Sequence, residues 1–92
     1  MLTVKVLLIQ GVCPVYKVGD EFYIIDGYRL KANFPLCMHS LASIMPYYVA
    51  LSKGISPKEL GLSKSEGSAF VQCLDPCEYT GGGTVIFELL IA

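Results

Sequence analysis

The sequence predicts a small α+β domain with the element order β-β-α-β-β. Segments near both ends of the chain are rich in β-branched and aromatic residues and alternate along their length, as strands do. In the middle of the chain, apolar residues recur at helical spacing. The economical arrangement is a four-stranded, largely antiparallel sheet with one main helix, kinked at a proline, packed on a face. A chain of 92 residues has room for one such domain, so we assign residues 1–92 to a single domain.

The first two strands are expected at Leu2–Ile9 and Glu21–Ile25. The first is rich in Val, Leu and Ile, and strand alternation places four of its side chains on one face: Leu2, Val4, Val6 and Leu8. The segment between the two strands is punctuated by glycines and a proline. The second strand is aromatic and β-branched until Asp26-Gly27 ends it.

A helix interrupted by a proline is expected next. Apolar side chains at intervals of four and three residues form one helical stripe: Cys37, Leu41, Ile44, Tyr48 and Leu51. Pro46 lies inside the stripe, where it removes one backbone hydrogen bond and forces a kink or a break into two shorter helices. Gly54 ends the helix, and Ser56-Pro57-Lys58-Glu59 then offers a capping box for one further helical turn.

The last two strands are expected at Ala69–Leu74 and Thr84–Ile91. Alternation in the final strand places four side chains on one side: Val85, Phe87, Leu89 and Ile91. Asp75-Pro76 and Gly81-Gly82-Gly83 between the two strands mark a long hairpin connection.

Charge and hydropathy exclude two classes of partner. The chain carries 7 basic and 8 acidic side chains, and its lysines are scattered, so no basic stripe is available for nucleic acid. The apolar run at 36–51 is shorter than the roughly 20 residues that span a bilayer, and Pro46 interrupts it, so no membrane span is expected. Lys5 breaks the apolar start of the chain and no cleavage site follows. We therefore expect a cytoplasmic protein with reduced thiols.

The four cysteines carry the only side chains with obvious special chemistry. Cys73 and Cys77 have the close spacing of a metal-binding turn. The expected topology brings the helix start at Cys37 near these two and leaves Cys13 at the far end. The predicted metal ligands are therefore Cys37, Cys73 and Cys77, with Cys13 as the fourth cysteine, and zinc or iron is the expected soft metal.

Two alternatives to metal binding remain open for these thiols. Reduced cysteine is often a small buried apolar residue, and Cys73 alternates with Ala69 and Val71 on one strand face, which favours burial. In the other alternative, the positive end of the helix dipole activates Cys37 as a nucleophile in thiol redox chemistry, and Cys77 or Cys73 resolves the intermediate. The sequence leaves open whether the chain is an enzyme.

The aromatic content predicts an exposed apolar surface. Six tyrosines and four phenylalanines are many for so small a core. An exposed apolar patch on a small domain marks an interface, and a closed dimer is the commonest way to cover it. We therefore expect a homo-oligomer, with a dimer favoured, or a complex with a protein partner.

The segment Cys13–Phe22, with the sequence CPVYKVGDEF, resembles a family of small uncharacterised cysteine-containing proteins frequent in anaerobic bacteria and archaea. The similarity continues in order through Cys37, the segment 43–51, Val71-Gln72-Cys73 and the final strand. The resemblance implies that Cys13, Cys37 and Cys73 match family cysteine positions, and it implies a fold class without naming a reaction. This chain departs from the family in lacking tryptophan after Cys37 and in having Leu74 where a second cysteine is frequent.

Three function hypotheses therefore follow from the sequence. The first is a binding module whose cysteines hold a soft metal. The second is a structural or interaction module in which the thiols are buried and inert and a tyrosine-rich surface binds a partner or a second copy. The third is a thiol-dependent redox accessory enzyme.

Overall fold

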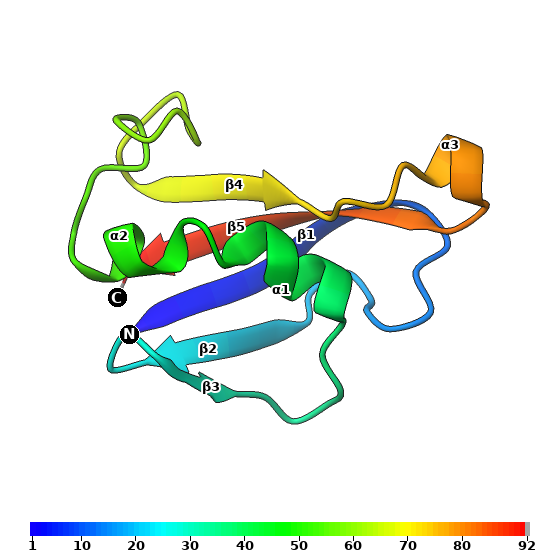
Figure 1. Ribbon diagram of the computed structural model, residues 1–92, viewed down its shortest axis with the longest axis horizontal. Helices are drawn as coiled ribbons and strands as arrows, with labels where there is room; N and C mark the ends of the chain where they lie inside the picture. The colour runs from blue at the N-terminus through cyan, green and yellow to red at the C-terminus, as the bar shows by residue number, and fades with distance from the viewer. Residues whose placement is uncertain (92) are drawn as a thin grey trace.

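Five strands form one antiparallel sheet in the order β3-β2-β1-β5-β4 in the computed structural model, which describes residues 1–91. Along the chain the elements are β1 (Leu2–Gly11), β2 (Glu21–Ile25), β3 (Arg29–Lys31), α1 (Met38–Ile44), α2 (Tyr48–Ser52), β4 (Ser68–Gln72), α3 (Cys77–Thr80) and β5 (Gly83–Ile91). Helices α1 and α2 lie on one face of the sheet, and α3 stands at the far end of β1 and β5 (Figure 1). The predicted α+β class and the antiparallel sheet are confirmed.

The sequence predicts four strands, but the sheet has five. The additional strand is β3. This strand has three residues, and two of them are basic, so it lacks the apolar alternation that marks a strand. It forms because the chain reverses at Asp26 and Gly27, whose φ angles of 58° and 83° are typical of a tight hairpin turn. The same Asp-Gly pair that ends β2 therefore starts a further strand.

The prediction of one main helix is also corrected. Helix α1 ends at Ile44 and α2 begins at Tyr48, so Pro46 breaks the helix rather than kinking it. The segment after Ser56 is a series of hydrogen-bonded turns and not a regular helix, and it includes one helical turn as predicted, with the Leu60 N–H donating to the Ser56 carbonyl at 3.2 Å. A third short helix, α3, occupies the connection that was predicted as a hairpin loop.

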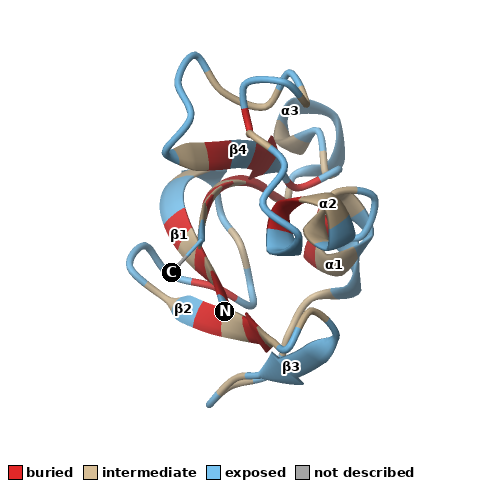
Figure 2. Ribbon diagram, turned by 90° about the vertical axis from the view of Figure 1, so that its left-hand side faces the viewer, coloured by how far each residue is buried: buried red, intermediate tan, exposed pale blue. Residues whose placement is uncertain are grey.

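The core lies between the sheet and the α1–α2 layer. Its largest fully buried side chains are Phe22 on β2 and Phe87 on β5, and burial of each such side chain contributes roughly 1.5–3 kcal/mol. Figure 2 shows buried segments on β1, β2 and β4, whereas β3 is exposed along its whole length. The core is therefore concentrated away from the β3 edge.

A bulge in β1 changes which side chains face this core. Val6 pairs with Phe87 and Leu8 with Ile86, so Leu7 is an extra residue on its strand. Beyond the bulge Ile9 packs against the core, while Leu8 is exposed. The prediction that Leu8 lies on the same face as Val6 is wrong, because one inserted residue inverts the alternation.

Within residues 1–91, none of the helices has the length and apolar character needed to cross a membrane.

Candidate functional site

A buried tyrosine fastens the loop after β1 to the start of α1. Tyr16 is 5% exposed, and its ring stacks on Phe22 and meets Phe87 edge-on. Its hydroxyl accepts the Cys37 N–H at 2.9 Å and lies 2.7 Å from the Ser40 hydroxyl, which donates to the Cys37 carbonyl at 2.7 Å. Ser40 has one hydroxyl proton, so the Tyr16 hydroxyl must donate to Ser40. We call this closed cycle of Tyr16, Cys37 and Ser40 the Tyr16 cluster.

The Tyr16 cluster holds a neutral phenol. Burial raises the pKa of Tyr16 above its ordinary value of 10.0, and the hydrogen bonds that join its hydroxyl to Ser40 and to the Cys37 main chain oppose that rise. Negative charge on the Cys37 or Cys13 thiol would add to the rise. The hydroxyls of Tyr16 and Ser40 and the main-chain N–H and C=O of Cys37 all bond within the cluster, so it acts as a structural tie.

The structure groups the cysteines differently from the prediction. The Cys13 sulfur accepts the Tyr16 N–H at 3.3 Å, and the Cys37 N–H binds the hydroxyl of the same tyrosine. These two bonds join the cysteines to opposite ends of Tyr16, so the expected separation of Cys13 from Cys37 stays a prediction. Gly83 also approaches the loop after β1 so closely that a Cβ on it would lie 2.7 Å from the Cys13 nitrogen.

The other two cysteines lie elsewhere. Cys73 is buried on the core face beside Ala69 and Val71, which confirms the predicted alternation. Cys77 begins α3, which projects away from α1 at the far end of the molecule (Figure 1). The predicted proximity of Cys77 to Cys37 is therefore wrong, because the connection after β4 carries Cys77 outward.

No metal-ligand group is assembled among residues 1–91. Neither the predicted set Cys37, Cys73, Cys77 and Cys13 nor any other group of three His, Cys, Asp or Glu side chains there is placed to hold a metal ion. All four thiols are free, and three of them are half-buried. Binding of zinc or iron by these residues stays a prediction for elemental analysis.

The second candidate site is a groove between the α1–α2 layer and the β2–β3 hairpin. Two cavities of about 180 and 370 Å³ adjoin here and share Ile24 and Tyr28 as lining residues. The smaller cavity is lined by apolar and aromatic side chains, namely Ile24, Tyr28, Leu30, Leu41, Ile44, Met45 and Tyr48. We call the two cavities together the hairpin groove. Its apolar part is concave and exposed, as binding sites are.

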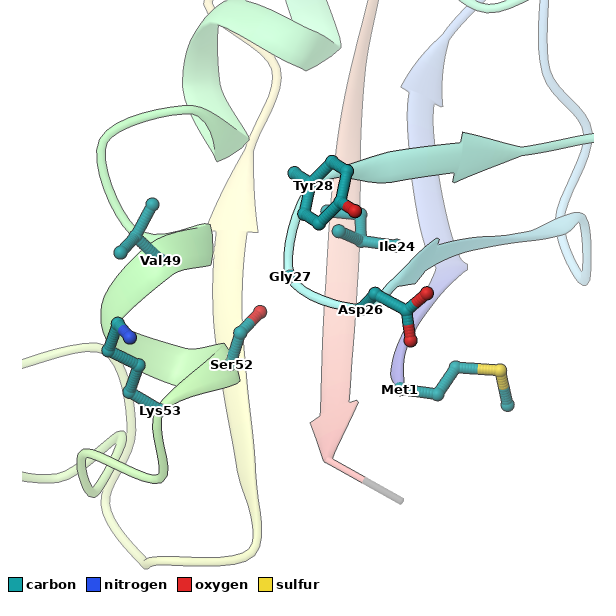
Figure 3. Close-up of a pocket in the computed structure, with 8 residues that line it drawn as sticks. All are labelled: Met1, Ile24, Asp26, Gly27, Tyr28, Val49, Ser52 and Lys53. Carbon is teal, nitrogen blue, oxygen red and sulfur yellow. The ribbon is translucent and has the colours of Figure 1, made fainter.

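The larger cavity supplies a polar end to the hairpin groove. Figure 3 shows the Ser52 hydroxyl pointing from α2 toward the Asp26–Gly27 turn and the Tyr28 hydroxyl pointing toward Asp26. The Asp26 carboxylate pairs with Arg29, and both side chains are exposed. The Lys53 amine turns away from the opening (Figure 3). The polar end therefore offers two hydroxyl groups close to a surface ion pair.

The hairpin groove exists because the helices are too short to cover the sheet. The contacts of α1 and α2 with the sheet are mainly to β4 and β1, and β3 is left exposed along its whole length. Leu30 on β3 is 50% exposed and Met45 after α1 is 59% exposed, although both line the groove. Side chains that would be core in a larger domain thus remain open to solvent.

Strand β3 adds an unpaired main chain to this region. It lies at the end of the sheet and pairs with β2 alone. Within residues 1–91, its main chain makes no hydrogen bond beyond that ladder. Sequence reasoning missed both β3 and the groove. The available signal was Leu30 between two basic residues directly after an Asp-Gly turn.

No family model, curated protein or solved structure matches the chain. The resemblance to the cysteine-containing family therefore stays a prediction.

Proposed function

We propose that the protein is an interaction module that binds an apolar segment of a partner protein in the hairpin groove. The observation that carries the proposal is the exposure of Leu30, Met45 and Tyr28 around one concave surface. Exposed apolar side chains that cluster around a groove mark binding surfaces in small domains. The Tyr16 cluster supports the proposal, since its hydrogen bonds tie down the start of α1, which forms one wall of the groove.

Selection from displayed random linear peptides tests the proposal. We expect peptides with apolar residues to enrich on the native protein and to lose binding to Met45→Lys, because the lysine places a charge in the apolar groove. Leu74→Lys is the matched control, since Leu74 is 54% exposed and lies outside the groove. Enriched peptides that bind the native protein and Met45→Lys equally, or no enrichment at all, would refute the proposal.

Self-association is a second candidate function, and the outer face of the sheet favours it. We define the outer face as the side away from α1 and α2, with Lys5 on β1 opposite Glu21 on β2 and Glu88 on β5. Within residues 1–91, Lys5 forms no ion pair with either glutamate. A two-fold axis parallel to the strands between β1 and β5 would place Lys5 of each copy over Glu88 of the other.

Sedimentation equilibrium tests this second candidate. We expect Lys5→Glu to weaken the dimer, because two glutamates then face each other across the axis, and Lys5→Glu with Glu88→Lys to restore it. A protein that is monomeric at every concentration, or a double variant no better than the single one, would rule out this geometry. The folding of each variant is checked by circular dichroism.

A further inference from the structure

The register of β3 places its apolar side chain on one face of the sheet and its two basic side chains on the other. Leu30 lies opposite Ile24 and lines the hairpin groove. Arg29 and Lys31 lie opposite Ile25 and Tyr23, and strand alternation places them on the other face of the sheet. The edge strand therefore presents one apolar side chain toward the groove and two cations away from it, of which Arg29 is paired with Asp26 and both partners are exposed.

The main chain of β3 is open to a further strand. Edge strands present a row of unpaired N–H and C=O groups, and an extended peptide can add to such an edge by main-chain hydrogen bonds. A strand added beside β3 would alternate its side chains in step with those of β3. One side chain of the added strand would lie beside Leu30 at the groove, and its two neighbours would lie beside Arg29 and Lys31.

We propose that the groove's occupant is an extended segment that adds to β3 as a sixth strand, with apolar residues toward the hairpin groove and acidic residues toward Arg29 and Lys31. This inference rests on the proposed interaction function and names the partner's chemistry. Opposite charges on directly neighbouring strands stabilise a pair, and like charges oppose it. The apolar residue beside Leu30 would cover surface that the helices leave exposed.

The charges also argue against a second copy of the chain at this edge. Pairing β3 with β3 of another copy around a two-fold axis would place the basic side chains Arg29 and Lys31 of one copy beside those of the other, and the like charges would repel. Pairing β3 with β4 of another copy meets an edge that is already in use, because the Phe70 N–H donates to the Leu62 carbonyl at 2.8 Å. An acidic and apolar segment from a different protein fits the edge better than either.

The experiment compares two synthetic peptides with the full chain, one of alternating glutamate and valine and one of alternating lysine and valine. We expect the acidic peptide to bind about tenfold more tightly by fluorescence anisotropy, a factor that corresponds to about 1.4 kcal/mol. Its binding should weaken as salt rises, because the cations involved are exposed. Hydrogen exchange measured by NMR should show new protection of amides within β3. Equal affinity for the two peptides, or no protection of β3, would overturn the proposal.

Charge reversal gives an independent test. The double variant Arg29→Glu with Lys31→Glu should reverse the preference in favour of the lysine peptide. Lys58→Glu with Lys64→Glu is the matched control, since it makes the same change in net charge at exposed positions outside β3 and should keep the native preference. An unchanged preference in the β3 variant would contradict strand addition at this edge.

These outcomes distinguish the inference from the function on which it rests. Peptides from the display selection that bind in a manner sensitive to Met45→Lys but leave β3 unprotected would sustain the interaction function and refute strand addition. Failure of both the selected and the synthetic peptides to bind would refute both.

Discussion

The two edges of the sheet differ in how they are protected against pairing with another strand. At one edge, β4 is covered by the chain that precedes it, since the Phe70 N–H donates to the Leu62 carbonyl, and β4 buries Ala69 and Val71 in the core. At the other edge, β3 is short, exposed and basic, and it is paired on one side only. Both arrangements discourage pairing with strands of other molecules. The β4 edge is covered by the preceding chain segment, and β3 is short and positively charged. Within residues 1–91, β3 therefore keeps its outer main chain free of further hydrogen bonds, while its charge selects what can pair with it.

The largest expected effect is a difference in stability between two leucine truncations, one in the core on β5 and one exposed on β3. Leu89→Ala should lower the free energy of unfolding by about 2–5 kcal/mol, because Leu89 is fully buried and its truncation leaves a cavity. Leu30→Ala should cost less than about 1 kcal/mol, because Leu30 is half-exposed. Urea unfolding measures both values. Equal losses would mean that β3 belongs to the core after all.

The next effect concerns the Tyr16 cluster, which anchors the segment that follows β3. Tyr16→Phe should lower the free energy of unfolding by about 1–3 kcal/mol, since the Cys37 N–H loses its acceptor and the Ser40 hydroxyl loses a donor. Urea unfolding at neutral pH measures the loss. Ser43→Ala is the matched control, because the Ser43 hydroxyl is exposed and bonds only within α1. A Tyr16→Phe variant as stable as native would show that the cluster contributes nothing.

The same cluster predicts a dependence on pH. The pKa of Tyr16 is raised in the folded state, so the unfolded chain loses this proton first as pH rises above about 10. Native protein should therefore lose stability above that pH, through the folded pKa of Tyr16, to a greater degree than Tyr16→Phe does. Parallel losses in the two proteins would contradict a buried, neutral phenol.

A smaller effect is expected in the hydrogen exchange rates of main-chain amides at the two edges. The Phe70 amide should exchange with solvent more slowly than any amide of β3, because it is hydrogen-bonded to Leu62 beside the core. Hydrogen exchange followed by NMR on the free protein measures this order. Faster exchange at Phe70 would show that the Leu62 segment opens readily and that the β4 edge is also available.

The smallest effect is expected for the ion pair at the β2–β3 turn. Arg29→Ala should change the free energy of unfolding by less than about 1 kcal/mol, because Arg29 and Asp26 are both exposed and such pairs contribute little. Thermal unfolding at low and high salt measures it. A large loss would mean that the ion pair, rather than the Asp26–Gly27 backbone, holds β3 in place.

The parts of the fold that depend on apolar periodicity could be predicted from the sequence. The alternation of Leu2, Val4 and Val6 is of this kind. Pro46 also marked the place where the helix is interrupted, although the structure has two short helices there instead of one kinked helix. Strand β3 could not be predicted that way, because a short basic edge strand forms from its turn and its neighbour rather than from its own pattern. The bulge at Leu7 could not be predicted either. A bulge shifts the pairing register between two strands, and the apolar residues around Leu7 give no sign of that shift.

Less of the candidate site could be predicted. The sequence singled out the cysteines for their chemistry, yet Cys77 is carried outward on α3 and no metal-ligand group is assembled among residues 1–91. The hairpin groove depends on how far the helices extend over the sheet, a length that is decided by Pro46 and by loop geometry. Only the general expectation of exposed apolar surface could be drawn from the aromatic content.

The approach of Gly83 to Cys13 makes the glycine run a point of close passage between two chain segments. Any side chain at Gly83 would push against the main chain of the loop that leads to Tyr16. In a survey of random substitutions, almost every replacement of Gly83 should therefore destabilise the fold. From the sequence alone, a run of three glycines before a strand would suggest a flexible connection. The part of the sequence that looks most permissive is thus one of the least free to vary.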